Sequence, residues 1–145
     1  MTERGAAAVA AKGDELPRLE IHGVNADFMK IAALVLRDGN PIHFDTAVVK
    51  TAGLGTREVN QGAVTMAYVL NLLIDWGGSR SAVYDLKCRF KANVFAGDDV
   101  LVGGEVVRVA DSEDGRLVEC DIWVDGVDGI RVISGCASIR TSDQI

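Results

Sequence analysis

The stretch of residues 61–76, QGAVTMAYVLNLLIDW, restricts the possible folds of this chain more than any other segment. It is apolar almost throughout, broken mainly by Thr65, Asn71 and Asp75, and the glycine pair at 77–78 ends it. A helix that is apolar on every side has to be surrounded by other parts of the protein. The sequence therefore predicts a long central helix with the other elements packed around it.

The segments that follow this helix have the pattern of β-strands. In YDLKCRFKA, residues 84–92, apolar and polar side chains alternate with a period of two, which is typical of a half-buried strand. Three further strand-like runs follow, DVLVGGEVVRV, RLVECDIWVDG and IRVISGCASIR, and the short polar connections between them suit antiparallel hairpins. We therefore expect an α+β domain with a single hotdog fold, in which a curled antiparallel sheet wraps around the long central apolar helix.

Length and charge restrict the domain count and the class of partner. The chain has 145 residues, the size of one domain, and a net charge of −6 that argues against nucleic acid or an anionic membrane as partner. No stretch approaches the ~20 uninterrupted apolar residues that span a bilayer. We expect a disordered N-terminal tail over residues 1–17, a hotdog domain over residues 18–145, and a soluble cytoplasmic protein with reduced cysteines in its core.

A second helix and the loop after it contain the polar residues of greatest interest. Asn25 is a good N-cap for ADFMKIAALVLR, in which apolar residues recur at helical spacing: Phe28, Ile31, Ala32, Val35 and Leu36. The loop LRDGNPIHFD then places Asp38, Asn40 and Asp45 beside His43, one of only two histidines. Its turn-forming residues should end the helix and stiffen the loop, and Asp45 is best explained as a cap for the next segment.

The run DGNPIH, residues 38–43, resembles the Asp-x-Asn-Pro-Ile-His signature of MaoC-like (R)-specific enoyl-CoA hydratases and dehydratases. The QGAVTMAYV helix and the strand CRFKANVFAGDDV, with its Phe-x-x-x-Val-x-x-Gly-Asp pattern, extend the resemblance from about residue 25 onwards. Two positions depart from the usual family pattern, because Gln61 replaces a histidine and Ala67 replaces a serine found in some members. The Arg-Asp start of the loop also resembles the small subunits of two-subunit steroid side-chain hydratases.

This resemblance implies a catalytic role for Asp38 and His43, which would grip one water and handle the proton transfers of hydration. It also implies that the backbone N–H of Gly62, in the first turn of the central helix, stabilises charge on the thioester oxygen. Asn40 and Gln61 would complete the substrate-binding site. Without the family pattern, structural roles would be favoured, with Asp38 and Asn40 as helix terminators and His43 as a hydrogen-bonded histidine at the edge of a loop.

The implied substrate is an acyl-CoA or an acyl-carrier-protein thioester, with no cofactor other than the coenzyme A of the substrate and no metal. Lys87, Arg89 and Lys91 alternate along one strand and are candidates for binding the coenzyme A phosphates, although strand faces are often charged for solubility alone. We expect a homodimer or larger assembly, or a heteromer with a related hotdog chain. Two alternative functions stay open: a subunit that depends on such a partner for activity, and a hotdog thioesterase.

Overall fold

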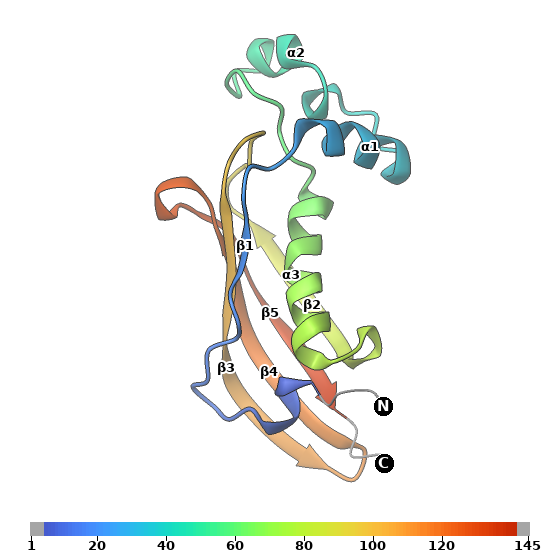
Figure 1. Ribbon diagram of the computed structural model, residues 1–145, viewed down its shortest axis with the longest axis vertical. Helices are drawn as coiled ribbons and strands as arrows, with labels where there is room; N and C mark the ends of the chain where they lie inside the picture. Colours follow the sequence, from blue (N-terminus) through green and yellow to red (C-terminus); the bar gives the residue numbers. More distant parts are fainter. Residues whose placement is uncertain (1–4, 142–145) are drawn as a thin grey trace.

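The computed structural model describes residues 5–141 and contains one antiparallel sheet with a long helix packed on one face (Figure 1). The five strands follow the order β1-β3-β4-β5-β2 across the sheet, so that the last three strands of the chain form a meander at its centre. Their bounds are β1 (Leu19–Ile21), β2 (Val83–Phe90), β3 (Val100–Ser112), β4 (Gly115–Asp125) and β5 (Arg131–Thr141). The predicted α+β hotdog fold is confirmed.

Helix α3 (Gly62–Gly77) is the predicted central helix, but only one side of it is covered within this chain. Val69 and Leu73 are fully buried against the sheet, whereas Ala63 and Asn71 are exposed on the opposite side of the helix. The sheet is open, with β1 and β2 at its two edges, and therefore does not close around the helix. The expectation of a helix surrounded by its own chain is thus met on the sheet side alone.

The four strands predicted after the central helix are present with close to the expected bounds. Along β4 the side chains of Val118, Cys120 and Ile122 are buried under α3, and alternate residues face the opposite side of the sheet. Tyr84 departs from the predicted alternation and is 61% exposed, because the pairing of β2 with β5 shifts register at this residue. The short strand β1 was missed by the sequence analysis.

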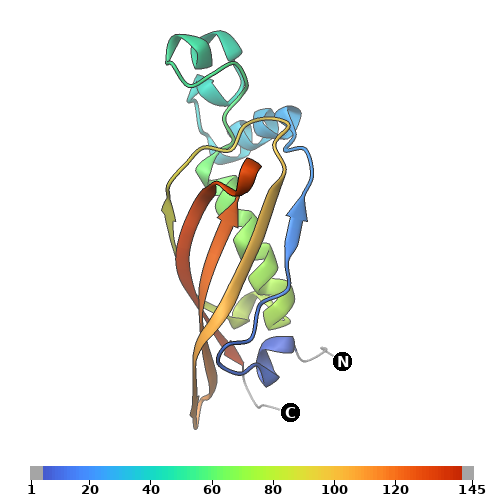
Figure 2. The same ribbon diagram turned by 90° about the vertical axis from the view of Figure 1, so that its left-hand side faces the viewer.

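The prediction of a disordered N-terminal tail is wrong for residues 5–17, and residues 1–4 lie outside the described residues. The 3₁₀ helix η1 (Ala6–Val9) packs beside the C-terminal end of α3, with Ala7 fully buried in the core (Figure 2). Leu16 is also buried, and its N–H donates to the carbonyl of Gly104 on β3. Small side chains explain this order, because they let the segment approach the helix and the sheet closely.

A helical segment projects beyond the end of the sheet, next to the N-terminus of α3 (Figures 1 and 2). It contains α1 (Ala26–Leu36), the 3₁₀ helix η2 (Pro41–His43) and α2 (Thr46–Thr51). Helix α1 is present as predicted, but its apolar stripe is mostly exposed, including Phe28 at 53% and Val35 at 76%. Among residues 5–141, no helix is long and apolar enough to cross a membrane.

The three cysteines occupy different environments. Cys120 is buried, Cys88 is half-buried and Cys136 is exposed, so the expectation of core thiols is wrong for Cys136. Strand register explains the difference, since Cys136 pairs with Lys87 and Asp121 on the face of the sheet opposite α3. Burial raises the pKa of the Cys120 thiol to about 12, which keeps it neutral and unreactive.

Candidate active site

The end of helix α1 determines where Asp38 lies. The side chain of Asn25 caps the start of the helix by accepting hydrogen bonds from the backbone N–H groups of Asp27 and Phe28, as the sequence predicted. At the other end Arg37 is left-handed, with φ 53°, and the N–H of Asp38 donates to the Ala33 carbonyl at 2.9 Å. This termination turns the chain sharply and holds the Asp38 backbone against the last turn of α1.

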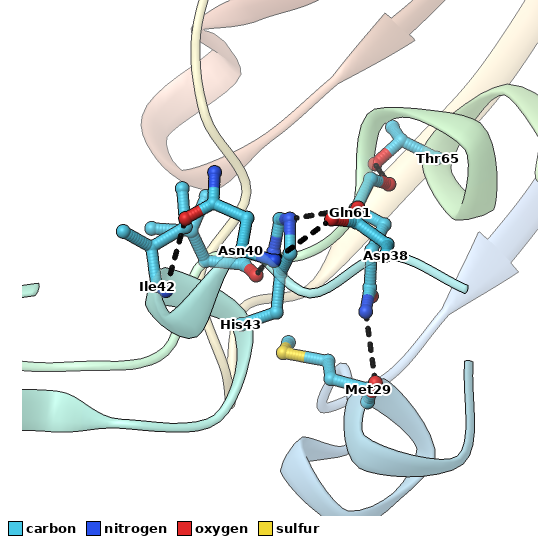
Figure 3. A network of polar contacts seen from close by, with 8 residues as sticks. Met29, Asp38, Asn40, Ile42, His43, Gln61 and Thr65 are labelled. Carbon is cyan, nitrogen blue, oxygen red and sulfur yellow. Dashed lines mark hydrogen bonds and ion pairs between the residues drawn. The ribbon is translucent and has the colours of Figure 1, made fainter. Parts of the chain in front are cut away.

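Hydrogen bonds from side chains to the backbone stiffen the loop between α1 and α2. Oδ1 of Asp38 accepts from the N–H of Asn40 at 3.1 Å, and Oδ1 of Asn40 accepts from the N–H of Ile42 at 3.3 Å (Figure 3). Pro41 begins η2, and the side chain of Asp45 caps α2, which confirms the predicted capping role of Asp45. The loop therefore presents its side chains in one fixed arrangement.

This arrangement brings Asp38 and His43 together. Nε2 of His43 lies 3.2 Å from Oδ2 of Asp38, and Nδ1 donates to the carbonyl of Val59 at 2.6 Å. Because a carbonyl oxygen only accepts, Nδ1 carries a proton and Nε2 is the nitrogen that can exchange one with Asp38 or with a water. His43 is only 6% exposed, whereas the Asp38 side chain is 36% exposed. The pair thus has one buried member and one member open to solvent or substrate.

Gln61 and Gly62 place the start of α3 next to this pair. Gln61 is the N-cap residue and is 1% exposed, and its Nε2 donates to the Met29 carbonyl of α1 at 2.8 Å. Gly62 follows in the first helical turn, where the helix itself supplies no acceptor for the backbone N–H. A Cβ at Gly62 would lie 3.3 Å from the Phe90 ring, so the glycine lets the ring pack closely against the start of the helix.

A polar group inside the start of α3 was missed by the sequence analysis. Nδ2 of Asn60 donates to Oγ1 of Thr65 at 2.9 Å, and both side chains are buried. Burial raises the pKa of the Tyr68 hydroxyl, and a hydrogen bond with Asn60 partly offsets that effect. The position of Asn60, directly before the N-cap residue, was the available signal, but a single asparagine cannot be distinguished from a turn residue by sequence alone.

A surface cavity of about 680 Å³ opens beside Asp38. Its lining combines apolar side chains with two cations and the Asp38 loop: Lys30, Ala33, Leu34, Arg37, Asp38, Gly39 and Phe44. The cavity follows the last turns of α1, on a face of the helix that the sequence analysis did not single out. Space for a ligand is therefore available next to the carboxylate of the pair.

The structure does not bring Lys87 and Arg89 together with Asp38 and His43. Leu86 and Cys88 pack on the core and the Phe90 ring lies beside Gly62, so the alternate residues of β2 face the opposite side of the sheet. Lys87 pairs there with Asp85 at 3.5 Å. Lys91 is exposed directly after the end of β2. The binding role suggested for these three cations stays a prediction.

Comparison with known proteins identifies the family of this chain. Residues 16–126 match a family model described as a MaoC like domain, and this range contains the loop, the central helix and most of the sheet. This chain belongs to the MaoC-like family. No curated protein matches the sequence.

Solved structures of MaoC-like proteins have the same fold. The (R)-hydratase from A. caviae involved in PHA biosynthesis is 23% identical with a TM-score of 0.79, covering 91% of this chain and 97% of its own. The R-hydratase PhaJ1 from Pseudomonas aeruginosa is 20% identical with a TM-score of 0.80, covering 97% and 88%. A chain of the ChsH1-ChsH2 complex from Mycobacterium tuberculosis is 21% identical with a TM-score of 0.77, covering 92% and 99%. At these identities the likeness shows the fold alone.

Proposed function

We propose that this MaoC-like protein catalyses the (R)-specific hydration of trans-2-enoyl thioesters and the reverse dehydration of 3-hydroxyacyl thioesters. The observation that carries the proposal is the pair formed by Asp38 and His43, with Nε2 and Oδ2 3.2 Å apart beside the start of α3. Neither group needs a cofactor for this chemistry, because the thioester itself activates the double bond.

Hydration requires that a water loses a proton as its oxygen attacks C3 and that C2 gains a proton. Asp38 and His43 can both contact one water at hydrogen-bond distance, which lets the pair remove one proton and deliver the other. Negative charge develops on the thioester oxygen in the same step. The N–H of Gly62, at the positive end of α3, stabilises that charge, and a donor of this kind typically contributes about 3–4 kcal/mol.

An assay with a panel of enoyl-CoA esters tests this proposal against a thioesterase. We expect loss of the absorbance of the conjugated thioester without release of free thiol, and chiral analysis of the product should give the (R)-3-hydroxyacyl thioester. Release of free thiol at the same rate would identify a thioesterase instead. A product of mixed or (S) configuration would contradict the proposed stereochemistry.

The open side of α3 favours an assembly of two chains. Ala67, Leu70 and Ile74 are only half-buried on that side, and β2 forms an edge of the sheet, where an unpaired strand exposes backbone hydrogen-bonding groups. We propose that β2 edges pair in a homodimer, so that two α3 helices lie side by side. Sedimentation of the purified chain should give a dimer or a larger species at micromolar concentration.

The second candidate function is that of a subunit that acts only with a related hotdog chain. The ChsH1-ChsH2 complex, which contains a chain of the same fold, is an assembly of two different proteins. Under this alternative the isolated chain is monomeric or inactive and gains hydratase activity when a related chain is co-expressed. Full activity of the purified chain alone would exclude it.

A further inference from the structure

We propose that Arg37, together with Lys30, binds a phosphate group of the thioester carrier at the mouth of the cavity beside Asp38. The inference deepens the proposed function, on which it rests, by assigning the part of the substrate that lies outside the reacting centre. Coenzyme A and the phosphopantetheine arm of a carrier protein both have a phosphate at the end of the pantetheine chain. The cavity of about 680 Å³ supplies the space.

The composition of the cavity fits such an arm. Ala33, Leu34 and Phe44 form apolar walls, and Leu34 is 80% exposed although it is a large apolar side chain. Lys30 and Arg37 add positive charge to the same lining, directly beside Asp38. An acyl thioester on its carrier has the matching character, with an apolar and amide chain next to the reacting group and phosphate beyond it.

The charges of the chain make local cations necessary. The net charge is −6, so an anionic carrier is repelled by the protein as a whole and needs cations at the point of contact. Within residues 5–141, no carboxylate forms an ion pair with the Arg37 guanidinium. Lys30 pairs with Asp27 at 3.0 Å, but both side chains are more than half exposed and such a pair exchanges readily for a phosphate.

The backbone at Arg37 supplies an independent argument. Its φ of 53° is in the left-handed region, at a helix end where glycine is strongly preferred. Gly39, only two positions later, is not in that region. A glycine at residue 37 would relieve the backbone, so the presence of arginine indicates a use for its side chain other than ending α1.

The left-handed backbone of Arg37 allows a test, because replacing Arg37 with glycine should weaken substrate binding without lowering stability. For Arg37→Gly we expect an unchanged or higher melting temperature and a KM for enoyl-CoA raised about tenfold, the value of one charge-assisted hydrogen bond of about 1.4 kcal/mol. The turnover number should stay unchanged, because Arg37 does not touch the reacting atoms. Arg37→Lys should recover most of the affinity, and Arg80→Ala, at the far end of α3, should behave as wild type.

The substrate series identifies the group that is bound. The same acyl chain is presented on coenzyme A, on 4′-phosphopantetheine and on pantetheine, which lacks phosphate. A KM effect of Arg37→Gly on the first two assigns the phosphate that both carriers share, and an effect on coenzyme A alone assigns the nucleotide phosphates. Both results support the proposal. An equal effect on all three thioesters, or an effect on none, overturns it.

Binding measurements separate this inference from the proposed function. If the wild-type chain turns over none of these thioesters, the proposed function fails, and calorimetric titration with coenzyme A and with pantetheine then decides the phosphate site. Tighter binding of coenzyme A that is lost in Arg37→Gly supports the site without any catalysis. Equal affinity for the two compounds, or coenzyme A binding that Arg37→Gly leaves unchanged, overturns it.

Discussion

The body of the molecule and its projecting segment are held together by different forces. In the body, α3 and the sheet enclose a continuous apolar core in which Leu73, Ile122 and Ile133 are almost completely buried. In the projecting segment from α1 to α2, most large apolar side chains are exposed, and the buried ones include Met29 and Val49. The candidate catalytic pair belongs to the segment with the smaller core.

Polar contacts replace burial in the projecting segment. Asn25, Asn40 and Asp45 each accept a backbone N–H within it. Three further hydrogen bonds attach it to the body, from Gln61 to Met29, from His43 to Val59 and from the Val59 N–H to the Ile42 carbonyl. A hydrogen bond of this kind contributes about 0.5–1.5 kcal/mol to stability. Single substitutions in this segment should therefore change the geometry of the site much more than they change global stability.

The largest expected effect comes from removing the pair itself. Asp38→Asn and His43→Ala should each lower turnover of enoyl-CoA by at least about a hundredfold, because each removes a positioned acid or base. Circular dichroism should stay close to wild type in both variants, and the melting temperature should fall only in His43→Ala, which leaves the Val59 carbonyl without its donor. The double variant should be little worse than either single variant, since both groups serve one water. Near-normal turnover by either single variant would contradict the assignment.

A substitution in the core of the body should have the opposite effect, with a large loss of stability and little change in turnover. Ile122→Ala removes a side chain that is 1% exposed under α3, and we expect a loss of about 2–5 kcal/mol in the free energy of unfolding. Denaturant titration measures this loss. Turnover per folded molecule at 25 °C should remain within about twofold of wild type, because site geometry depends on the polar contacts of the projecting segment. A hundredfold loss of turnover in the folded variant would remove the distinction between the two regions.

This distinction also explains what the sequence could and could not predict. The four long strands and the central helix were predictable, because alternation and an all-apolar run are direct consequences of packing on a sheet. Asn25, Asp45 and the turn residues before His43 were predictable as caps and loop stiffeners, since their short side chains bond to the backbone nearby. Contacts close in sequence leave a readable pattern.

Contacts between distant segments left no such pattern. The bond from Gln61 to Met29 joins residues 32 apart, and nothing in either residue type indicates it. The apolar stripe of α1 predicted a helix correctly, but exposure of Phe28 and Val35 depends on what the rest of the chain covers. Similarly, the order of residues 5–17 depends on small side chains fitting against α3 and β3, which composition alone describes as a flexible tail.

A moderate effect is expected when the loop loses its internal hydrogen bond. Asn40→Ala removes the acceptor for the Ile42 N–H, which helps fix the loop between Asp38 and His43. We expect turnover to fall about tenfold, with a change in the free energy of unfolding of no more than about 1 kcal/mol. Asn40→Asp keeps the acceptor oxygen and serves as the matched control. Equal losses in both variants would indicate a direct role for the amide in binding substrate.

The smallest expected effect concerns Gln61→His, which restores the residue usual for the family at this position. Gln61 is buried, and its Nε2 attaches α1 to the start of α3 through the Met29 carbonyl. A histidine ring N–H can donate to the same carbonyl, so the attachment and the neighbouring Gly62 should keep their positions. Turnover and substrate preference should change by less than about tenfold, the value of one ordinary hydrogen bond.

The matched variant Gln61→Ala leaves the Met29 carbonyl without its donor and should lower the free energy of unfolding by about 1–3 kcal/mol. If Gln61→Ala instead kept its stability and lost activity as completely as Asp38→Asn, Gln61 would act on the substrate and the division between positioning and proton-transferring residues would have to be redrawn.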